Sequence, residues 1–209
     1  MAFGIPQTHE IKTWKDRIAL YLSAALSPFI LIPVFIFIVC FTFSRNTFEL
    51  IQSFVTCFFF STVVPFANVF IALKRNKITD IHVAELAQRR EPFIVSLVSI
   101  LIGTLVLHYM KVPREIVILG WVMFLNGFIF FIISLFWKIS MHSSILAGII
   151  ASLMILVNVN YAWGFILLPL LIWARMHRQR HNIYQGIIAI VIAVVGLFIF
   201  FGFFGYPKW

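Results

Sequence analysis

The sequence predicts an all-α fold, a polytopic transmembrane helical bundle of six or seven spans with a polar site at one membrane face. Of the 209 residues, 62% are hydrophobic and only 11% are charged, whereas a soluble domain carries roughly 25% charged residues. The apolar residues form long runs, and most of these runs approach the ~20 residues that a helix needs to cross a bilayer. We therefore expect one integral membrane domain, with a polar amino-terminal segment at residues 1–16 and the bundle at residues 17–206.

Short polar breaks divide the chain into seven apolar segments. They lie at residues 17–43, 48–73, 93–110, 116–137, 144–157, 161–174 and 186–204. Pro28 and Pro33 in the first segment could kink its helix, and the second segment also carries a proline, Pro65. The fifth and sixth segments are short for a bilayer, so six spans remain if one of them does not cross fully. Cys40 and Cys57 lie inside apolar runs, which favours small core residues over a disulfide or a metal pair.

Charge indicates the orientation. If every segment crosses, one face carries only Arg45, Lys111, Arg114 and Lys208, which leaves twelve of the sixteen Lys and Arg residues for the other face. The positive-inside rule makes that richer face cytoplasmic, and we expect the plasma membrane of a prokaryote. Basic loops beside anionic headgroups also explain the net charge of +9, so membrane lipids are the expected partners and nucleic acid is not.

The most polar boundary is residues 175–185, which carry three arginines and two histidines between two apolar runs. On a continuous helix Arg178, His181 and Gln185 would share one face with Arg175. A guanidinium, an imidazole and an amide that face one spot suit a phosphate, because Arg binds the oxyanion and His can be nucleophile or proton carrier. The alternative is a basic flank that anchors two membrane helices.

A second polar break, residues 138–143, contains Ser140 and His142. A histidine beside a hydroxyl at the start of a helix can lie next to the free backbone N–H groups there, which form an anion site. Ser143 or Ser144 would then be the N-cap. The alternative is a capped membrane helix with an incidental interfacial histidine.

The third polar segment, residues 74–92, places Arg89 and Arg90 where they could reach a phosphate. The same segment carries the acidic and imidazole side chains of Asp80, His82, Glu85 and Glu91. No carboxylate spacing here suits a magnesium site of the DDxxD type. His177 and His181 form an i, i+4 pair that could ligate zinc, but three neighbouring arginines would repel a dication. We therefore expect no metal.

Taken in order, the three segments resemble the motifs of the type 2 phosphatidic acid phosphatase superfamily of membrane lipid phosphatases. That family carries Lys-x6-Arg-Pro, then Pro-Ser-Gly-His, then Ser-Arg-x5-His-x3-Asp. The third motif fits best, since Arg175, His181 and Gln185 keep its spacing, with Ala174 at the Ser position and Gln185 at the Asp position.

The other two motifs fit in part, and the resemblance covers roughly residues 74–209. In the second motif Ser140 and His142 match, while the Pro and Gly positions differ. The first motif is represented by Arg-Arg-Glu-Pro at residues 89–92, with one residue inserted, and by Lys77, the nearest lysine upstream.

The resemblance implies a phosphatase without metal or cofactor that hydrolyses a lipid or polyprenyl phosphate or diphosphate monoester. His181 would attack phosphorus and form a phosphohistidine, and His142 would protonate the leaving alcohol and then activate water. The implied phosphate-binding residues are Arg175, Arg89, Arg90, Ser140 and Lys77. In the family the Asp of the third motif orients the nucleophile and favours its charged form. Gln185 would keep the orientation without the charge.

Two other functions compete with this one. Gln185, Ala174 and the interrupted first motif favour a catalytically inactive phospholipid-binding or scaffold protein with a relict site. A small transporter or channel is disfavoured, because ionisable residues are nearly absent from the middle of the spans, where Asn126 is the main polar exception.

Overall fold

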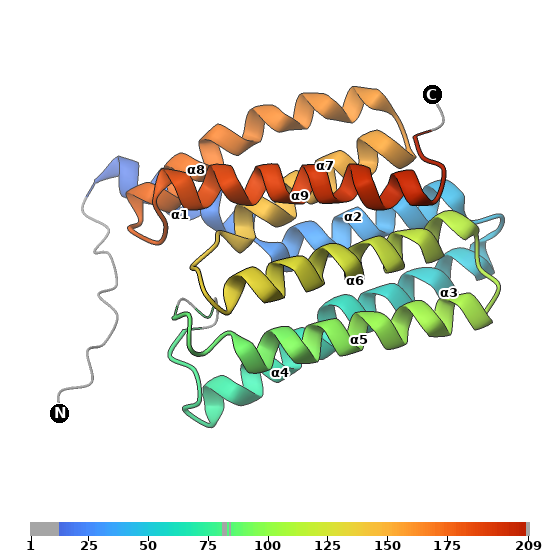
Figure 1. The fold of residues 1–209 in the computed structure, drawn as a ribbon, viewed down its shortest axis with the longest axis horizontal. Helices are drawn as coiled ribbons and strands as arrows, with labels where there is room; N and C mark the ends of the chain where they lie inside the picture. The colour runs from blue at the N-terminus through green and yellow to red at the C-terminus, as the bar shows by residue number, and fades with distance from the viewer. Residues whose placement is uncertain (1–12, 81–82, 84, 208–209) are drawn as a thin grey trace.

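The computed structural model describes residues 13–80, 83 and 85–207, and the described chain is helical without strands (Figure 1). The α-helices are α1 Trp14–Ala25, α2 Pro28–Phe43, α3 Thr47–Phe58, α4 Val64–Lys74, α5 Arg90–Tyr109, α6 Arg114–Ser134, α7 Met141–Leu156, α8 Leu167–His177 and α9 Ile183–Phe203. A π-helical segment, η1 (Phe59–Val63), joins α3 to α4, and a 3-10 segment, η2 (Val159–Ile166), precedes α8. The predicted all-α bundle is confirmed. Most of the predicted amino-terminal segment, residues 1–12, and His82 lie outside the described residues.

The predicted spans correspond closely to these helices. Among the described residues, five helices are long and apolar enough to cross a membrane, and a sixth span results if α1 and α2 are taken together. The fifth predicted segment is α7, an apolar helix of 16 residues. The chain is therefore a membrane protein, and a seventh span would require α7 to cross as well.

The first predicted span differs from the structure, because residues 17–43 do not form one kinked helix. α1 ends with Leu26 as its C-cap, α2 begins with Ser27 as its N-cap, and the two helices are bent by 41°. Pro28 occupies the first turn of α2, where its missing N–H leaves no hydrogen bond unmade, so the proline starts a helix here. In the second span Pro65 follows the π-helical segment η1, where the helix is locally widened.

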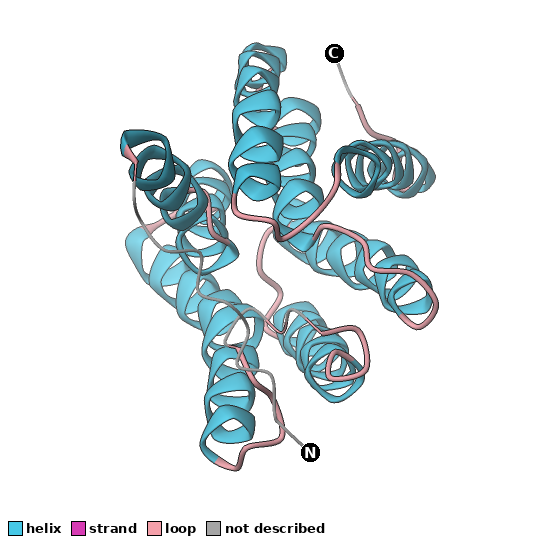
Figure 2. Cartoon of the chain, turned by 90° about the vertical axis from the view of Figure 1, so that its left-hand side faces the viewer, coloured by secondary structure: helices cyan, strands magenta, loops and turns pink. Residues whose placement is uncertain are grey.

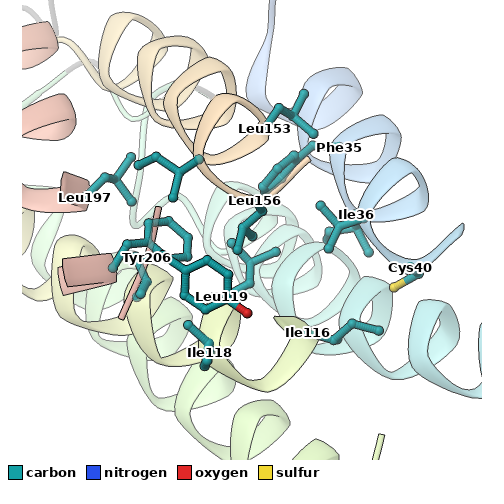
Figure 3. Close-up of a cluster of buried hydrophobic side chains, with 14 of the residues drawn as sticks. Phe35, Ile36, Cys40, Ile116, Ile118, Leu119, Leu153, Leu156, Leu197 and Tyr206 are labelled. Carbon is teal, nitrogen blue, oxygen red and sulfur yellow. The ribbon is translucent and has the colours of Figure 1, made fainter. Parts of the chain in front are cut away.

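The larger core lies toward the far end of the bundle from the polar segments. Figure 3 shows side chains from α2, α6, α7 and α9 packed together, among them Phe35, Leu119 and Leu156. Cys40 belongs to this core, and both it and Cys57 are free, as predicted. A second core next to the polar end joins α7, α8 and α9.

Antiparallel packing brings the three polar segments to one end of the bundle. The α4–α5, α6–α7 and α8–α9 connections and the start of α1 lie at the left in Figure 1, and the other connections and the carboxyl terminus lie at the right. Figure 2 looks onto the polar end, where these connections cross between the helices. The predicted one-sidedness of the polar segments is therefore present in the fold.

Candidate functional site

The stretch from Arg175 to Gln185 is not one continuous helix, so the predicted shared helix face is wrong. α8 ends at His177, the chain turns, and α9 begins at Ile183. A capping box starts the new helix: Asn182 Oδ1 accepts the Gln185 N–H at 2.9 Å, and Gln185 Oε1 accepts the Asn182 N–H at 3.2 Å. The turn nevertheless brings His181 onto Gln185, which is the contact that the spacing suggested.

The hydrogen bond between these two residues fixes the tautomer of His181. Gln185 Oε1 lies 3.0 Å from His181 Nδ1. The same oxygen accepts the backbone N–H of Asn182 at 3.2 Å, so it must be the amide oxygen, and Nδ1 must carry the proton. The other ring nitrogen, Nε2, then holds a lone pair. Gln185 thus orients the imidazole as predicted.

Two buried arginines lie beside this histidine. Arg175 and Arg89 are each 5% exposed. Arg175 Nη1 donates to Ser23 Oγ at 3.0 Å, and its buried Nε meets no acceptor among the described residues. Arg89 donates from Nε to the Val83 carbonyl and from Nη1 to the Ile139 carbonyl, both at 3.0 Å.

Neither of these two guanidinium groups forms a salt bridge with a carboxylate in the described chain. Burial of a charge without a counter-charge is unfavourable by several kcal/mol. Their hydrogen-bond partners are hydroxyl and carbonyl oxygens, which carry no full negative charge. An anion bound here would supply the missing charge.

The pKa of His181 records this environment. It is lowered to about 3, first by burial and then by the positive charge of Arg175. Arg89 and Lys138 add to the effect, and the hydrogen bond that His181 donates to Gln185 opposes it. The imidazole is therefore neutral at pH 7. Burial also lowers the pKa of Lys138, as do the charges of Arg89, Arg180 and Arg175. We call the group formed by Arg89, Lys138, Arg175 and His181 the basic cluster.

A carboxylate joins the rim of the cluster. Arg180 Nη1 lies 2.6 Å from Asp80 Oδ2, and this contact ties the α8–α9 turn to the loop between α4 and α5. The carboxylate of Asp80 also attracts the guanidinium of Arg175, so it offsets part of the positive charge of the cluster.

The α6–α7 connection contacts the same site but uses Ser140 in a different way from that predicted. Ser140 is the N-cap of α7, which the sequence analysis assigned to Ser143 or Ser144. Its Oγ lies 3.0 Å from Ser143 Oγ, and its backbone N–H donates to the Gln185 carbonyl at 3.3 Å. The Ser140 hydroxyl is therefore engaged in capping. His142, in the first turn of α7, is 5% exposed.

Two predicted phosphate-binding residues have other surroundings. Lys77 Nζ lies 3.2 Å from the exposed carboxylate of Glu91. Arg90 is exposed at the start of α5. His177, which the sequence analysis considered as a zinc ligand and rejected, lies 2.6 Å from Asp16.

Lys138 and Ser23 are site residues that the sequence analysis did not propose. Lys138 had a signal, because it lies two positions before Ser140 in the second motif. Ser23 belongs to α1 and reaches Arg175 across 152 positions of sequence, so local patterns give no indication of it.

Comparisons with known proteins identify no relative of this chain. No protein-family model, no curated protein and no solved structure matches the chain. Its function must be inferred from the geometry and charge of the basic cluster.

Proposed function

We propose that this membrane protein is a phosphatase that hydrolyses a lipid or polyprenyl phosphate or diphosphate monoester through a phosphohistidine on His181. The observation that carries the proposal is a neutral, oriented imidazole beside two buried arginines that form no salt bridge with a carboxylate in the described chain. A nucleophilic imidazole must be unprotonated at the attacking nitrogen, and the low pKa of His181 ensures this at pH 7. The surrounding cations would hold the nonbridging oxygens of the phosphoryl group.

The reaction would have two steps. In the first, the Nε2 lone pair of His181 attacks phosphorus, the P–O bond to the lipid alcohol breaks, and protonated His142 gives its proton to the departing oxygen. In the second, water attacks phosphorus, His142 takes a proton from it, and the P–N bond breaks to release inorganic phosphate. Arg175, Arg89 and Lys138 would stabilise the charge on the phosphoryl oxygens in both steps.

The negative charge of the substrate would also stabilise the histidine intermediate. Gln185 orients the imidazole but brings no negative charge, so the cations of the cluster oppose a positive charge on His181. A bound phosphate dianion would offset those cations. The substrate itself would therefore make a charged histidine intermediate tolerable. A divalent metal ion would be repelled by the same cations, which supports a metal-independent reaction.

One observation favours the alternative, a catalytically inactive phospholipid-binding or scaffold protein. Gln185 replaces the carboxylate that the resemblance would place beside the nucleophile, and loss of a carboxylate at the equivalent place in a serine protease triad lowers kcat by about 10⁴. The basic cluster would then bind a lipid phosphate without turnover.

Phosphate release from purified protein in detergent tests the proposal. The substrates are phosphatidic acid, phosphatidylglycerol phosphate and farnesyl diphosphate, each with EDTA present. We expect release that survives EDTA, disappears in His181→Ala and persists in His108→Ala, a control at the opposite end of the bundle. Release that depends on a divalent ion, or that His181→Ala leaves intact, contradicts the proposal. Saturable binding of these lipids without release supports the alternative.

A further inference from the structure

An elongated cavity of about 320 Å³ lies between α2, α4, α5, α6 and α7. Its walls are mainly apolar side chains of these helices, including Phe29, Leu97 and Ile149. One end of the cavity is lined by Arg89 and Pro92, and the other end by Ile100 and residues at a similar depth on the neighbouring helices. The cavity therefore begins at the basic cluster and extends toward the middle of the bundle.

The dimensions of the cavity match one hydrocarbon chain. Along α5 the lining extends from Pro92 to Ile100, and along α7 from Met141 to Ser152, which corresponds to roughly 12–17 Å at 1.5 Å per residue. A cavity of about 150 Å³ holds benzene with its six carbons, so this cavity has room for roughly a dozen carbons. That is about one carbon per 1.0–1.4 Å of cavity length, slightly less than a C–C bond of about 1.5 Å. The enclosed volume therefore suits one extended hydrocarbon chain.

The charged end of the cavity indicates what kind of molecule enters it. The Arg89 guanidinium donates from Nε and Nη1 to backbone carbonyls, and a guanidinium has five N–H donors, so three remain for a further partner. The same group lowers the pKa of His181. An anionic head group that binds the cluster would therefore leave its chain at the mouth of the cavity.

We propose that this cavity is the binding site for one hydrocarbon chain, of about twelve carbons, of a lipid whose phosphate binds the basic cluster. The inference rests on the proposed phosphate site. It narrows the ligand to a phosphate or diphosphate ester with a single chain inside the bundle, such as an alkyl phosphate or a short isoprenoid phosphate. In a two-chain lipid the second chain would have to remain outside the cavity.

A series of n-alkyl phosphates with 8 to 18 carbons tests this inference by the thermal stabilisation of the purified protein in detergent. Ser96 lines the cavity one turn beyond Pro92, so Ser96→Phe should block it there. Binding of dodecyl phosphate should weaken at least tenfold, while octyl phosphate is affected less. Val98→Phe introduces the same side chain at a position that is 49% exposed on the outer surface of α5, and should leave both ligands unaffected.

A second pair of variants addresses the deep end and also serves if Ser96→Phe does not fold. Ile100→Ala removes three carbons from the lining, so the best chain should become roughly three carbons longer. Ile102→Ala makes the same change at a position that is 45% exposed, and should not alter the preference. The inference is overturned if no alkyl phosphate binds, or if the cavity variants leave the chain-length preference unchanged.

The outcomes separate this inference from the proposed function. Binding that follows chain length and responds to Ile100→Ala supports the cavity assignment even if no phosphate is ever released. Phosphate release that is insensitive to chain length and to Ile100→Ala supports the phosphatase and overturns the cavity assignment.

Discussion

Substitution of Gln185 by glutamate should raise the pKa of His181, because it places a carboxylate next to the imidazole without a change in side-chain length. The Gln185 Oε1 to His181 Nδ1 distance is 3.0 Å. Opposite charges about 4 Å apart attract by about 4 kcal/mol at an effective dielectric constant of 20, and each pKa unit corresponds to 1.36 kcal/mol. The carboxylate should therefore raise the pKa of His181 by about three units, from about 3 to about 6.

NMR titration of ¹⁵N-labelled histidine in detergent measures this change directly. The His181 signals are identified by their disappearance in His181→Ala. We expect no titration of wild-type His181 between pH 5 and 8, and a titration near pH 6 in Gln185→Glu. Glutamate also suits the third position of the capping box that begins at Asn182, so α9 should keep its start and the variant should fold.

Gln185→Asp is the matched control, although aspartate is the residue that the resemblance would place here. Its side chain is shorter by one C–C bond, about 1.5 Å, so its carboxylate would stop short of His181 Nδ1. Its effect on the pKa should be clearly smaller than that of glutamate. If the pKa of His181 remains below 4 in Gln185→Glu, or if aspartate raises it more, the imidazole is not held by residue 185 in the way described.

Three further predictions concern acid stability, helix packing and orientation. The pKa of His181 is about 3 in the folded protein and about 6.5 in an unfolded chain, so between these pH values the unfolded chain binds more protons. Acidification from pH 6.5 to 4 should therefore lower the free energy of unfolding by up to ~1.4 kcal/mol per pH unit. Thermal unfolding measures this slope, and His181→Ala should reduce it. A Cβ at Gly103 would lie 2.6 Å from Phe60 Cβ, so Gly103→Ala should lower the unfolding free energy by about 1–3 kcal/mol, whereas Gly202→Ala, with nothing within 4 Å, should not. Gln179→Cys, in the exposed α8–α9 turn, should react with an impermeant maleimide in inverted vesicles and not in intact cells if the site is cytoplasmic.

The gathering of the polar segments could be predicted from counting alone. An odd number of crossings between successive polar segments would put them on different faces, and the sequence gives an even number each time. Direct contacts now join these segments, since Arg89 donates to the Ile139 carbonyl and Ser140 donates to the Gln185 carbonyl. Hydrophobic runs indicate the length of a helix well, so most of the spans were predicted closely, while the break of the first span into α1 and α2 was not.

A polar break between two spans was predicted at residues 175–185, but the start of α9 within it was not placed. The spacing of Arg178, His181 and Gln185 fits a helical face, so these residues were expected to share one face if the stretch were helical. Asn182 followed three residues later by Gln185 is the pattern of a capping box, which marks a new helix start. Both patterns share Gln185. The first accounts for its contact with His181, and only the second accounts for its two hydrogen bonds with Asn182.

Long-range contacts account for the rest of what the sequence did not indicate. Arg175 was predicted to bind phosphate, but its hydroxyl partner comes from α1, and no local pattern pairs a serine with an arginine so far away. Lys77 was proposed through its position upstream of the first motif, yet a nearby carboxylate, Glu91, lies 3.2 Å from its ammonium group. Sequence spacing can predict that residues lie at one membrane face, but it does not determine which of them contact each other there.

The partners of the buried arginines bear on why a glutamine can occupy position 185. A carboxylate there would partly neutralise Arg175 and Arg89, which would weaken the attraction for a phosphate while it stabilises a charged histidine. With an amide, residue 185 adds no negative charge to the cluster, and the ligand provides it. Gln185→Glu should therefore weaken the binding of inorganic phosphate in the same sample in which it raises the pKa of His181. A variant that raises that pKa and binds phosphate more tightly would mean that the anion site and His181 are electrostatically separate, and the proposed phosphohistidine mechanism would lose its basis.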